Sequence, residues 1–279
     1  MAHDAGDPLL PEPLAKPTPA RMYDYFLGGK DNFEVDRVAA ERIIAKLGVA
    51  KTRSVAWENR RFLWRAVEYL SGECGITQFI DVGAGLPTMR NTHEIAQAAH
   101  PDARVVYVDN DPIVQSHGRA LLATGDGTAL VAADMREPAA ILDAPETKEL
   151  IDFSQPVGLL FIAVFHFVVP AGHPRYVPGH AVPGEIVAAF GDRVAAGSYL
   201  AITNNCSDEA SPEEVAAAEE GYKSSTAPMI VRSRGEIEAF FDGWRLVRPG
   251  VVPAWQWHSE PDESPRTQLM LGGIAVKQG

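Results

Sequence analysis

The sequence is poor in cysteine and in long apolar runs, and each shortage excludes a class of protein. Its two cysteines, Cys74 and Cys206, stand far apart without a C-x-x-C spacing, so we expect neither a disulfide framework nor a structural zinc site. The richest apolar run, 157–170, is interrupted by Gly158 and His166 and is shorter than the roughly 20 residues that cross a bilayer. This run is typical of a buried strand and its exit loop.

Basic charge is also scarce. Acidic side chains outnumber basic ones, 37 against 25, and the formal net charge is −12. Because this balance repels nucleic-acid phosphates and anionic lipid surfaces, we expect neither nucleic acid nor a membrane as a partner. The N-terminus lacks the basic segment and apolar stretch of an export signal. These features predict a cytoplasmic protein and leave its oligomeric state open.

The chain divides into three parts by composition and periodicity. Residues 1–20 contain five prolines and no periodicity, which is typical of a disordered tail. Residues 21–72 carry apolar side chains at three- and four-residue spacing, which predicts a helical cap with amphipathic helices over 31–47 and 54–70. In residues 73–279, short apolar runs alternate with helical stretches, which predicts the cofactor-binding domain.

The alternation after residue 73 predicts an α/β fold with a Rossmann-like, mostly parallel sheet that is buried on both faces. Two late strands predict an antiparallel C-terminal edge hairpin. The predicted strands are 78–82, 104–109, 129–133, 157–165, 199–203, 244–248 and 268–275. The predicted helices of this domain are 93–100, 112–122, 138–143, 185–194, 212–220 and 235–241.

A glycine-rich turn follows the first of these strands. Asp81 stands near the strand end, and Gly83 and Gly85 let the backbone turn tightly beside a ligand. Open parallel sheets bind ligands at the carboxyl ends of their strands, where the strand order reverses. Taken alone, a plain tight turn explains the glycine pair equally well.

Two further strands end in an acid. Asp109 lies 24 residues after Gly85, where a carboxylate can accept hydrogen bonds from both hydroxyls of an adenosine ribose. Asp134 ends the third strand, where it can accept from the exocyclic amine of adenine while Met135 packs on the ring. Because neighbouring parallel strands end side by side, we expect Asp81, Asp109 and Asp134 to share one cleft. The alternative is that these three acids are ordinary surface residues without a shared ligand.

The same turn departs from the pattern of a dinucleotide site. A pyrophosphate needs the full G-x-G-x-x-G sequence at a helix N-terminus. Here Thr88 takes the third glycine position, and the next helix is predicted to start at Asn91, with Glu94 completing a capping box. S-adenosylmethionine carries no phosphate, and its cationic portion tolerates an acidic pocket. The sequence therefore favours S-adenosylmethionine over NAD, and an NAD-dependent oxidoreductase is the less favoured alternative.

Several segments, in order, resemble the motifs of one protein family. It is an actinobacterial S-adenosyl-L-methionine-dependent methyltransferase family, formerly catalogued as a domain of unknown function. The likeness covers residues 18–277 and implies a class I methyltransferase sheet with an N-terminal helical cap. It implies S-adenosyl-L-methionine as cofactor and no particular acceptor. The segments are 21–33 (RMYDYFLGGKDNF), 81–88 (DVGAGLPT), 91–94 (NTHE), 105–112 (VVYVDNDP), 163–168 (AVFHFV), 232–237 (RSRGEI) and 240–243 (FFDG).

The resemblance also implies which residues bind the cofactor. In the methyltransferase domain these are Asp81, Gly83 and Gly85 beside the methionine part, Asp109 and Asn110 at the ribose, Asp134 and Met135 at the adenine, and Ala163. The opening motif is expected to fold over the cofactor with Tyr25, Gly29 and Asn32 facing it, and a packing cap without ligand contact is the alternative. Asn59 and Arg60 are candidates for the cofactor carboxylate, although helix-surface decoration is favoured for them.

His166 is the candidate catalytic residue, because it follows the fourth strand where class I methyltransferases present groups toward the transferred methyl. A neutral imidazole there could take a proton from an acceptor hydroxyl or amine. The alternative is a structural histidine that shapes the loop before Pro170. No metal site is expected. The sequence predicts a methyltransferase (EC 2.1.1.-) with an unidentified small-molecule acceptor, and a cofactor-binding sensor or accessory protein without transferase activity is the alternative.

Overall fold

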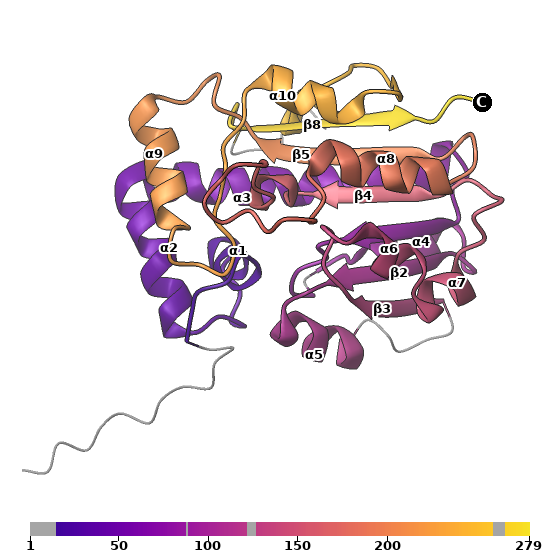
Figure 1. Cartoon of the computed structure of the whole chain (residues 1–279), viewed down its shortest axis with the longest axis horizontal. Helices are drawn as coiled ribbons and strands as arrows, with labels where there is room; N and C mark the ends of the chain where they lie inside the picture. The colour runs from indigo at the N-terminus through magenta and orange to yellow at the C-terminus, as the bar shows by residue number, and fades with distance from the viewer. Residues whose placement is uncertain (1–14, 88, 122–126, 259–265) are drawn as a thin grey trace, which may run out of the picture.

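The computed structural model describes residues 15–87, 89–121, 127–258 and 266–279. Residues 1–14 of the predicted tail and Thr88 of the glycine-rich turn lie outside these ranges. Within them, one eight-stranded sheet carries helices on both faces, and further helices gather at one end of it (Figure 1).

The sheet is mostly parallel, as predicted. Strands β1 to β5 are parallel neighbours in the order β3-β2-β1-β4-β5. Strand β8 pairs antiparallel with β5, and β6 and β7 pair antiparallel with β8. The predicted fold class, including the antiparallel C-terminal edge, is therefore confirmed. The strands are β1 (Gln78–Val82), β2 (Arg104–Asp109), β3 (Thr128–Ala132), β4 (Gly158–Ile162), β5 (Tyr199–Asn205), β6 (Arg245–Leu246), β7 (Val252–Pro253) and β8 (Met270–Val276).

The helices of the sheet domain also follow the predicted pattern. Helix α4 begins after Asn91, whose backbone N–H donates to Glu94 Oε2 over 2.6 Å in the expected capping box. The short helix α7 was not predicted, because its one buried residue, Thr147, gives no apolar periodicity. These helices are α4 (Thr92–Ala99), α5 (Pro112–Leu121), α6 (Pro138–Leu142), α7 (Pro145–Leu150), α8 (Pro183–Arg193), α9 (Pro212–Gly221) and α10 (Arg234–Glu238).

Side chains of β1 alternate between two apolar cores, one on each face of the sheet. Ile80 packs in a cluster that includes Phe190 of α8. Phe79 packs in the opposite cluster with Phe62 of helix α3 (Val49–Glu68). Burial of such side chains stabilises the fold by about 1.5–3 kcal/mol each. Because Asp81 is two residues after Phe79, it lies on the face covered by α3 and α4.

The N-terminal helices lie at the end of the sheet toward which β2, β3 and β4 point, beside α9 (Figure 1). Helix α1 (Pro19–Leu27) begins after its cap Thr18, which is buried, so the fold starts earlier than the predicted boundary at residue 21. Gly28, at φ 83°, ends α1, and α2 (Glu34–Leu47) follows. A third apolar cluster, which we call the end cluster, joins α1, α2, α3 and α9. Its buried members are Met22, Phe26, Ala39, Ala40, Ile43, Ala56, Tyr222 and Met229.

Among the described helices, none has both the length and the apolar character needed to cross a membrane.

Candidate functional site

A cavity of about 580 Å³ lies at the carboxyl ends of the parallel strands. Loops after β1, β2, β3 and β4 form one side of it, and helices α1, α2, α3 and α9 form the other. The strand order reverses between β1 and β4, which is where open parallel sheets bind their ligands. The volume is in the range of ordinary small-molecule sites.

Nine of the predicted site residues line this cavity. They come from four strand exits that are far apart in the sequence. They are Asp81, Gly83, Gly85, Asp109, Asn110, Asp134, Met135, Ala163 and His166. The expected meeting of Asp81, Asp109 and Asp134 in one cleft therefore holds, and these three with Asp111 form what we call the acidic end of the cavity.

Hydrogen bonds join the strand exits of the acidic end. The Gly85 N–H donates to Asp109 Oδ2 over 2.9 Å, and the Asp111 N–H donates to Asp109 Oδ1 over 2.9 Å. Asn110 Nδ2 donates to Asp134 Oδ2 over 3.2 Å. Burial raises the pKa of Asp109 to about 6, although the backbone hydrogen bonds from Asp111 and Gly85 oppose that shift. The hydrogen bonds hold this carboxylate in place, and it takes up a proton at a higher pH than an ordinary aspartate does.

Asp134 differs from Asp109 because it already has a cationic partner. Arg136 Nε donates to Asp134 Oδ1 over 2.9 Å, and the two side chains form an ion pair. Burial favours the neutral acid, but the hydrogen bonds and charge of Arg136 keep the pKa of Asp134 below its usual value. A ligand group that binds Asp134 therefore meets an ionised carboxylate.

The two glycines of the turn have different roles. Gly83 adopts φ 73°, and a Cβ on it would lie 2.3 Å from Cγ1 of Val164, so the exit loops of β1 and β4 pack directly against each other here. Gly85 adopts φ 67°, and a Cβ on it would meet no atom within 4 Å. Both need the left-handed conformation that glycine permits. Both line the cavity, but a side chain at Gly85 would meet open space, whereas one at Gly83 would meet Val164.

Asn59 and Arg60 are buried, at 3% and 8% exposure, and both line the cavity. The favoured interpretation of helix-surface decoration was therefore wrong. Arg60 Nε is buried and has no hydrogen-bond partner in the described part of the chain. Asp81 accepts from Thr92 Oγ1 over 2.6 Å, and burial raises its pKa while the nearby Arg60 charge opposes the rise. The α3 face that meets Asp81 thus supplies a cation.

A buried polar chain links the N-terminal helices to the exit of β4. Asn59 Nδ2 donates to Tyr23 Oη over 2.9 Å, and Tyr23 Oη donates to the Ala56 carbonyl over 2.9 Å. Thr203 Oγ1 donates to Asn59 Oδ1 and accepts from the Ala163 N–H over 2.8 Å. This chain fixes Ala163, which adopts φ 57° beside the cavity.

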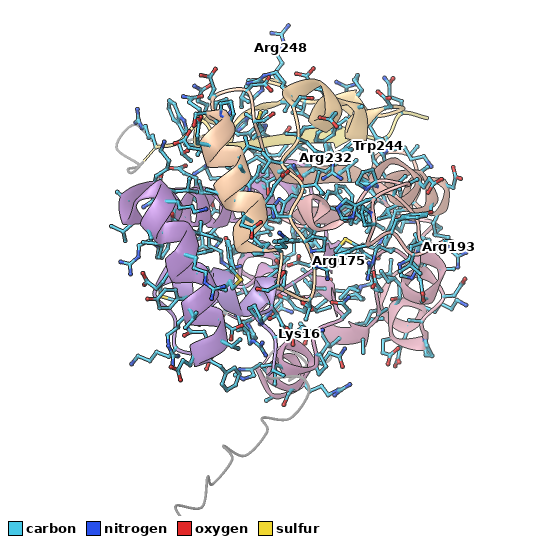
Figure 2. All side chains as sticks on the ribbon, turned by 60° about the vertical axis from the view of Figure 1, so that its left-hand side comes forward. Lys16, Arg175, Arg193, Arg232, Trp244 and Arg248 are labelled. Atoms are coloured by element: carbon cyan, nitrogen blue, oxygen red, sulfur yellow. The ribbon has the colours of Figure 1, made fainter. Side chains whose placement is uncertain are left out.

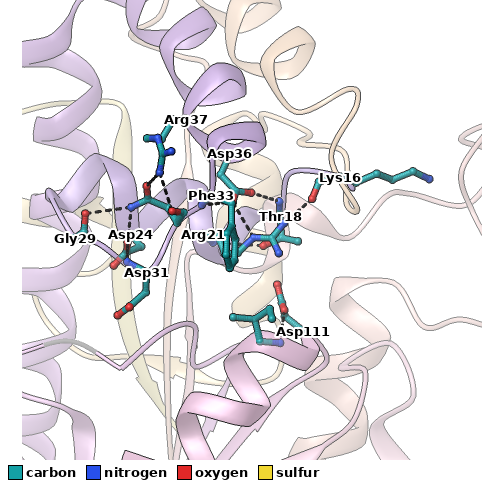
Figure 3. Close-up of polar contacts among 12 residues, drawn as sticks. Lys16, Thr18, Arg21, Asp24, Gly29, Asp31, Phe33, Asp36, Arg37 and Asp111 are labelled. Carbon is teal, nitrogen blue, oxygen red and sulfur yellow. Dashed lines mark hydrogen bonds and ion pairs between the residues drawn. The ribbon is translucent and has the colours of Figure 1, made fainter. Parts of the chain in front are cut away.

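Tyr25, Gly29 and Asn32 do not line the cavity. The exposed Tyr25 hydroxyl donates to Glu41 of α2. Asn32 Nδ2 donates to Asp24 Oδ2 over 2.7 Å and to the Gly29 carbonyl over 3.1 Å, which closes the turn after α1 (Figure 3). The structure places these three residues where they hold the shape of the opening motif.

Other members of the same helix take the position expected for Tyr25. Tyr23 and Phe26 line the cavity. A helix of 3.6 residues per turn puts positions three apart on one face, whereas Tyr25 lies on another face. Helical periodicity could have identified Tyr23 and Phe26, but the sequence offered no reason to prefer one face as the ligand side. Asp111 was also missed: it lines the cavity, and its Oδ2 is buried without a hydrogen-bond partner among the described residues.

His166 is 3% exposed and lies in the short helical turn η3 (Phe165–Phe167) after β4. Its Nδ1 is buried, and no described residue bonds to it. Burial lowers the pKa of His166 to about 3, and the nearby Arg232 charge lowers it further in the same direction. The imidazole is therefore neutral, and it can exchange hydrogen bonds with a ligand in the cavity.

Comparison with known proteins shows which family the chain belongs to. A family model described as S-adenosyl methyltransferase matches residues 13–278. The chain belongs to this family. A crystal structure from Thermobifida fusca, of a protein proposed to be a methyltransferase, is 40% identical, with 98% of this chain and 100% of that chain covered at a TM-score of 0.85. A search of curated proteins found no match.

The second similar structure is a DUF574 family protein from Streptomyces avermitilis. It is 38% identical, with 95% of this methyltransferase and 98% of that chain covered at a TM-score of 0.86. The resemblance seen in the sequence motifs is thus confirmed, and S-adenosylmethionine is the cofactor of the family.

The acidic end suits this cofactor. It offers carboxylates for hydroxyl and ammonium groups, and the orphaned Arg60 Nε and Asp111 Oδ2 are polar atoms that a ligand could satisfy. Gly85 leaves open space where a side chain would intrude. Among the described residues, no group of His, Cys, Asp or Glu side chains is arranged to hold a metal ion. The residues of the site fit a phosphate-free, partly cationic nucleoside.

Proposed function

We propose that the chain is an S-adenosylmethionine-dependent methyltransferase with a small-molecule acceptor. One observation carries the proposal. A single cavity joins the carboxylates at the ends of β1, β2 and β3 to a buried, neutral histidine at the end of β4 and to an apolar wall beyond it. A cofactor and an acceptor can therefore occupy adjoining parts of the same space.

The acidic end holds the cofactor in this proposal. Asp109 accepts hydrogen bonds from the ribose hydroxyls through the lone pairs that its two backbone donors leave free. Asp134 accepts from the adenine amine beside Met135. Asp81 and the Gly83–Gly85 turn border the methionine part, and Arg60 binds its carboxylate. Tyr25, Gly29 and Asn32 do not contact the cofactor in this proposal. They hold the conformation of the opening motif, which places Tyr23 in the cavity wall.

The cofactor supplies a methyl group whose carbon bonds to the acceptor atom as its bond to sulfur breaks and sulfur keeps the electron pair. The protein's part is positioning, since alignment of reacting groups about 3–3.5 Å apart accounts for much of the rate of such a displacement. His166 accepts the hydrogen bond of the acceptor's nucleophilic group and orients it; because its pKa is low, it passes the proton released as the new bond forms on to solvent rather than keeping it.

A small acceptor is supported by the walls of the cavity. Segments 15–20 and 222–231 both contribute to the lining, and the Thr226 N–H donates to the Pro17 carbonyl over 3.0 Å across them. The net charge of −12 also disfavours nucleic acid. An acceptor atom must enter this space to meet the methyl group, so a compact molecule is favoured over a folded macromolecule.

Calorimetric titration tests the cofactor assignment. We expect S-adenosylmethionine and S-adenosylhomocysteine to bind at one site per chain and NAD to show no heat. Isotope-labelled methyl donor incubated with a metabolite extract should then yield a labelled product that depends on the protein. Binding without any labelled product would favour the sensor or accessory alternative, and absence of binding would overturn the proposal.

A further inference from the structure

The part of the cavity away from the carboxylates is lined by apolar side chains of the end cluster. We call this part the apolar end and define it by Phe26, Ile43, Phe167, Tyr222 and Met229. The rings of Phe167 and Tyr222 lie 5.2 Å apart, centroid to centroid. Aromatic faces and a methionine thioether pack well against a flat aromatic ligand. The lining therefore selects for an aromatic body.

Charge is concentrated elsewhere in the lining. The carboxylates form the acidic end, and Arg60 lies near Asp81. Arg136 is paired with Asp134, Glu214 is paired with Lys51, and the remaining cation of the lining, Lys16, is exposed. The Arg232 guanidinium behind His166 is used by the carbonyls of Phe165 and Val168. A charged ligand group among the five apolar side chains would therefore find no uncommitted opposite charge beside it in the described part of the chain, and an unpaired buried charge is strongly disfavoured. The ligand body must therefore be neutral.

Polar side chains beside this end include Asn205, whose Nδ2 donates to Met229 Sδ over 3.5 Å, and His166. The His166 ring contacts the ring of Phe167, with centroids 4.4 Å apart, while its backbone carbonyl is used by the Ile230 N–H over 2.7 Å. Nδ1 is fully buried and has no partner among the described residues, so a ligand in the cavity meets the ring at Nε2, which is an acceptor when the ring proton is on Nδ1. Arg232, which donates to the carbonyls of Phe165 and Val168, brings a positive charge close by and disfavours a second ring proton. An O–H donor from the ligand satisfies Nε2.

We propose that the methyl acceptor is a neutral, flat aromatic molecule that carries a phenolic hydroxyl, bound at the apolar end with its hydroxyl donating to His166. The inference rests on the proposed function, because the hydroxyl oxygen then lies between His166 and the cofactor. It goes beyond that function in stating the chemical class of the acceptor.

The outer wall of the apolar end limits the size of this molecule. Segment 222–231 forms the wall, and Arg175 ties it to the loop after β4. Arg175 Nη2 donates to the carbonyls of Ser225 and Thr226 over 3.1 and 2.8 Å. Figure 2 shows Arg175 beside the segment that follows α9, on the same face as Lys16 of the N-terminal segment. This wall bounds the apolar end on one side, which favours a compact ligand over an extended chain.

Binding to the complex with S-adenosylhomocysteine tests the inference without any turnover. The probes are 2-naphthol and 4-phenylphenol, each compared with its parent hydrocarbon and with the matching carboxylate. We expect at least one phenol to bind about tenfold or more tightly than its hydrocarbon, which is the value of one hydrogen bond of about 1.4 kcal/mol. We expect the carboxylates to bind more weakly than the phenols.

Two variants of α9 separate the apolar end from the rest of the protein. Ala218 lines the cavity, whereas Ala216 is exposed on the same helix. We expect Ala218→Phe to weaken phenol binding by tenfold or more and to change S-adenosylhomocysteine affinity by less than threefold. Ala216→Phe is the matched control and should change neither. His166→Phe should remove the advantage of the phenol over its hydrocarbon, which a purely structural histidine would not do.

The outcomes distinguish a failure of the proposed function from a failure of the inference about the acceptor. If S-adenosylhomocysteine does not bind, the proposed function fails and the inference fails with it. If it binds but the carboxylates or hydrocarbons bind as tightly as the phenols, or if neither phenol binds, only the inference is overturned. If His166→Phe leaves the preference for phenols intact, the contact to His166 is wrong.

Discussion

The backbone N–H of Gly85 donates to Oδ2 of Asp109 over 2.9 Å, and this bond ties the exit of β1 to the exit of β2. The carboxylate is thereby oriented before any ligand arrives. Its other oxygen is held in the same way by the Asp111 N–H. A preorganised acceptor loses little freedom on binding, so we expect Asp109 to contribute more to cofactor affinity than a mobile carboxylate would.

Asp109→Asn should weaken the binding of S-adenosylhomocysteine by about tenfold to a hundredfold, because hydrogen bonds to a charged acceptor are worth about 1.5–3 kcal/mol. Titration calorimetry on the purified variant measures the loss. Asp102→Asn is the control, since Asp102 is exposed and lies outside the cavity lining. An affinity within twofold of the parent protein in Asp109→Asn would show that the ribose is bound elsewhere.

The affinity for S-adenosylhomocysteine should also depend on pH through Asp109. Its pKa is raised to about 6 by burial, and a protonated carboxyl accepts hydrogen bonds less well than the anion. We therefore expect affinity to fall as the pH drops below about 6. The pKa of His166, about 3, is too low to cause this change. The fall should persist in His166→Gln and disappear in Asp109→Asn, and the opposite pattern would assign it to the histidine.

The same carboxyl lowers the stability of the ligand-free fold near neutral pH. Burial raises the pKa of Asp109 from 3.8 to about 6, so the folded state binds the proton more tightly than the unfolded state. Its favourable contribution is complete below pH 3.8 and is lost as the pH rises through 6, by roughly 3 kcal/mol. The free energy of unfolding of Asp109→Asn, relative to the parent, should therefore be higher at pH 8 than at pH 4.5. Denaturant titrations at both values measure the difference, and a constant difference would contradict the assigned pKa.

The acidic end was predictable because its causes are local. A buried strand, a turn and an acid follow one another within a few residues, and the parallel sheet then brings the acids of β1, β2 and β3 to one edge. The observed bounds of β1 and β2 equal the predicted ones for the same reason. Strand β3 ends one residue before the predicted position, at Ala132, without moving Asp134 from the cavity.

The apolar end was not predictable, because distant segments meet there. Tyr222 and Met229 follow α9, about 200 residues after Phe26, and their shared cluster depends on how α9 packs on α2. Likewise, the face of α1 that meets the cavity is set by the buried pair of Arg21 and Asp36, which fixes the rotation of α1 against α2 (Figure 3). Periodicity identifies these helices, but their relative rotation is a tertiary property.

The two glycines of the turn should respond differently to substitution. Gly83→Ala introduces a Cβ 2.3 Å from Cγ1 of Val164, in addition to an unfavourable φ of 73°. Gly85→Ala has a similar φ of 67° but no steric contact. We expect Gly85→Ala to lower the free energy of unfolding by about 1–2 kcal/mol, the cost of a left-handed residue, and Gly83→Ala to lower it by more. Equal losses would show that the exit loops of β1 and β4 are not in contact.

Arg175 should control how often the wall of segment 222–231 opens. Arg175 is exposed, and its guanidinium donates to the carbonyls of Lys223, Ser225 and Thr226 in the turn after α9 (Figure 2). Because these bonds are near solvent, Arg175→Ala should change the free energy of unfolding by less than about 1 kcal/mol. Loss of the tie should nevertheless let the wall open more often, so its amides should exchange hydrogen faster. Mass-spectrometric hydrogen exchange, resolved by peptide, measures this.

Arg193→Ala provides the matched control for that experiment. Arg193 is also exposed, but it pairs with Asp143 and lies over the ring of Phe153, away from the wall. It should leave exchange in segment 222–231 unchanged. If Arg175→Ala also leaves exchange there unchanged, the contacts to Pro17 and His166 suffice to hold the wall closed. The arginine would then not control access to the apolar end, and the wall would move only when those backbone hydrogen bonds break.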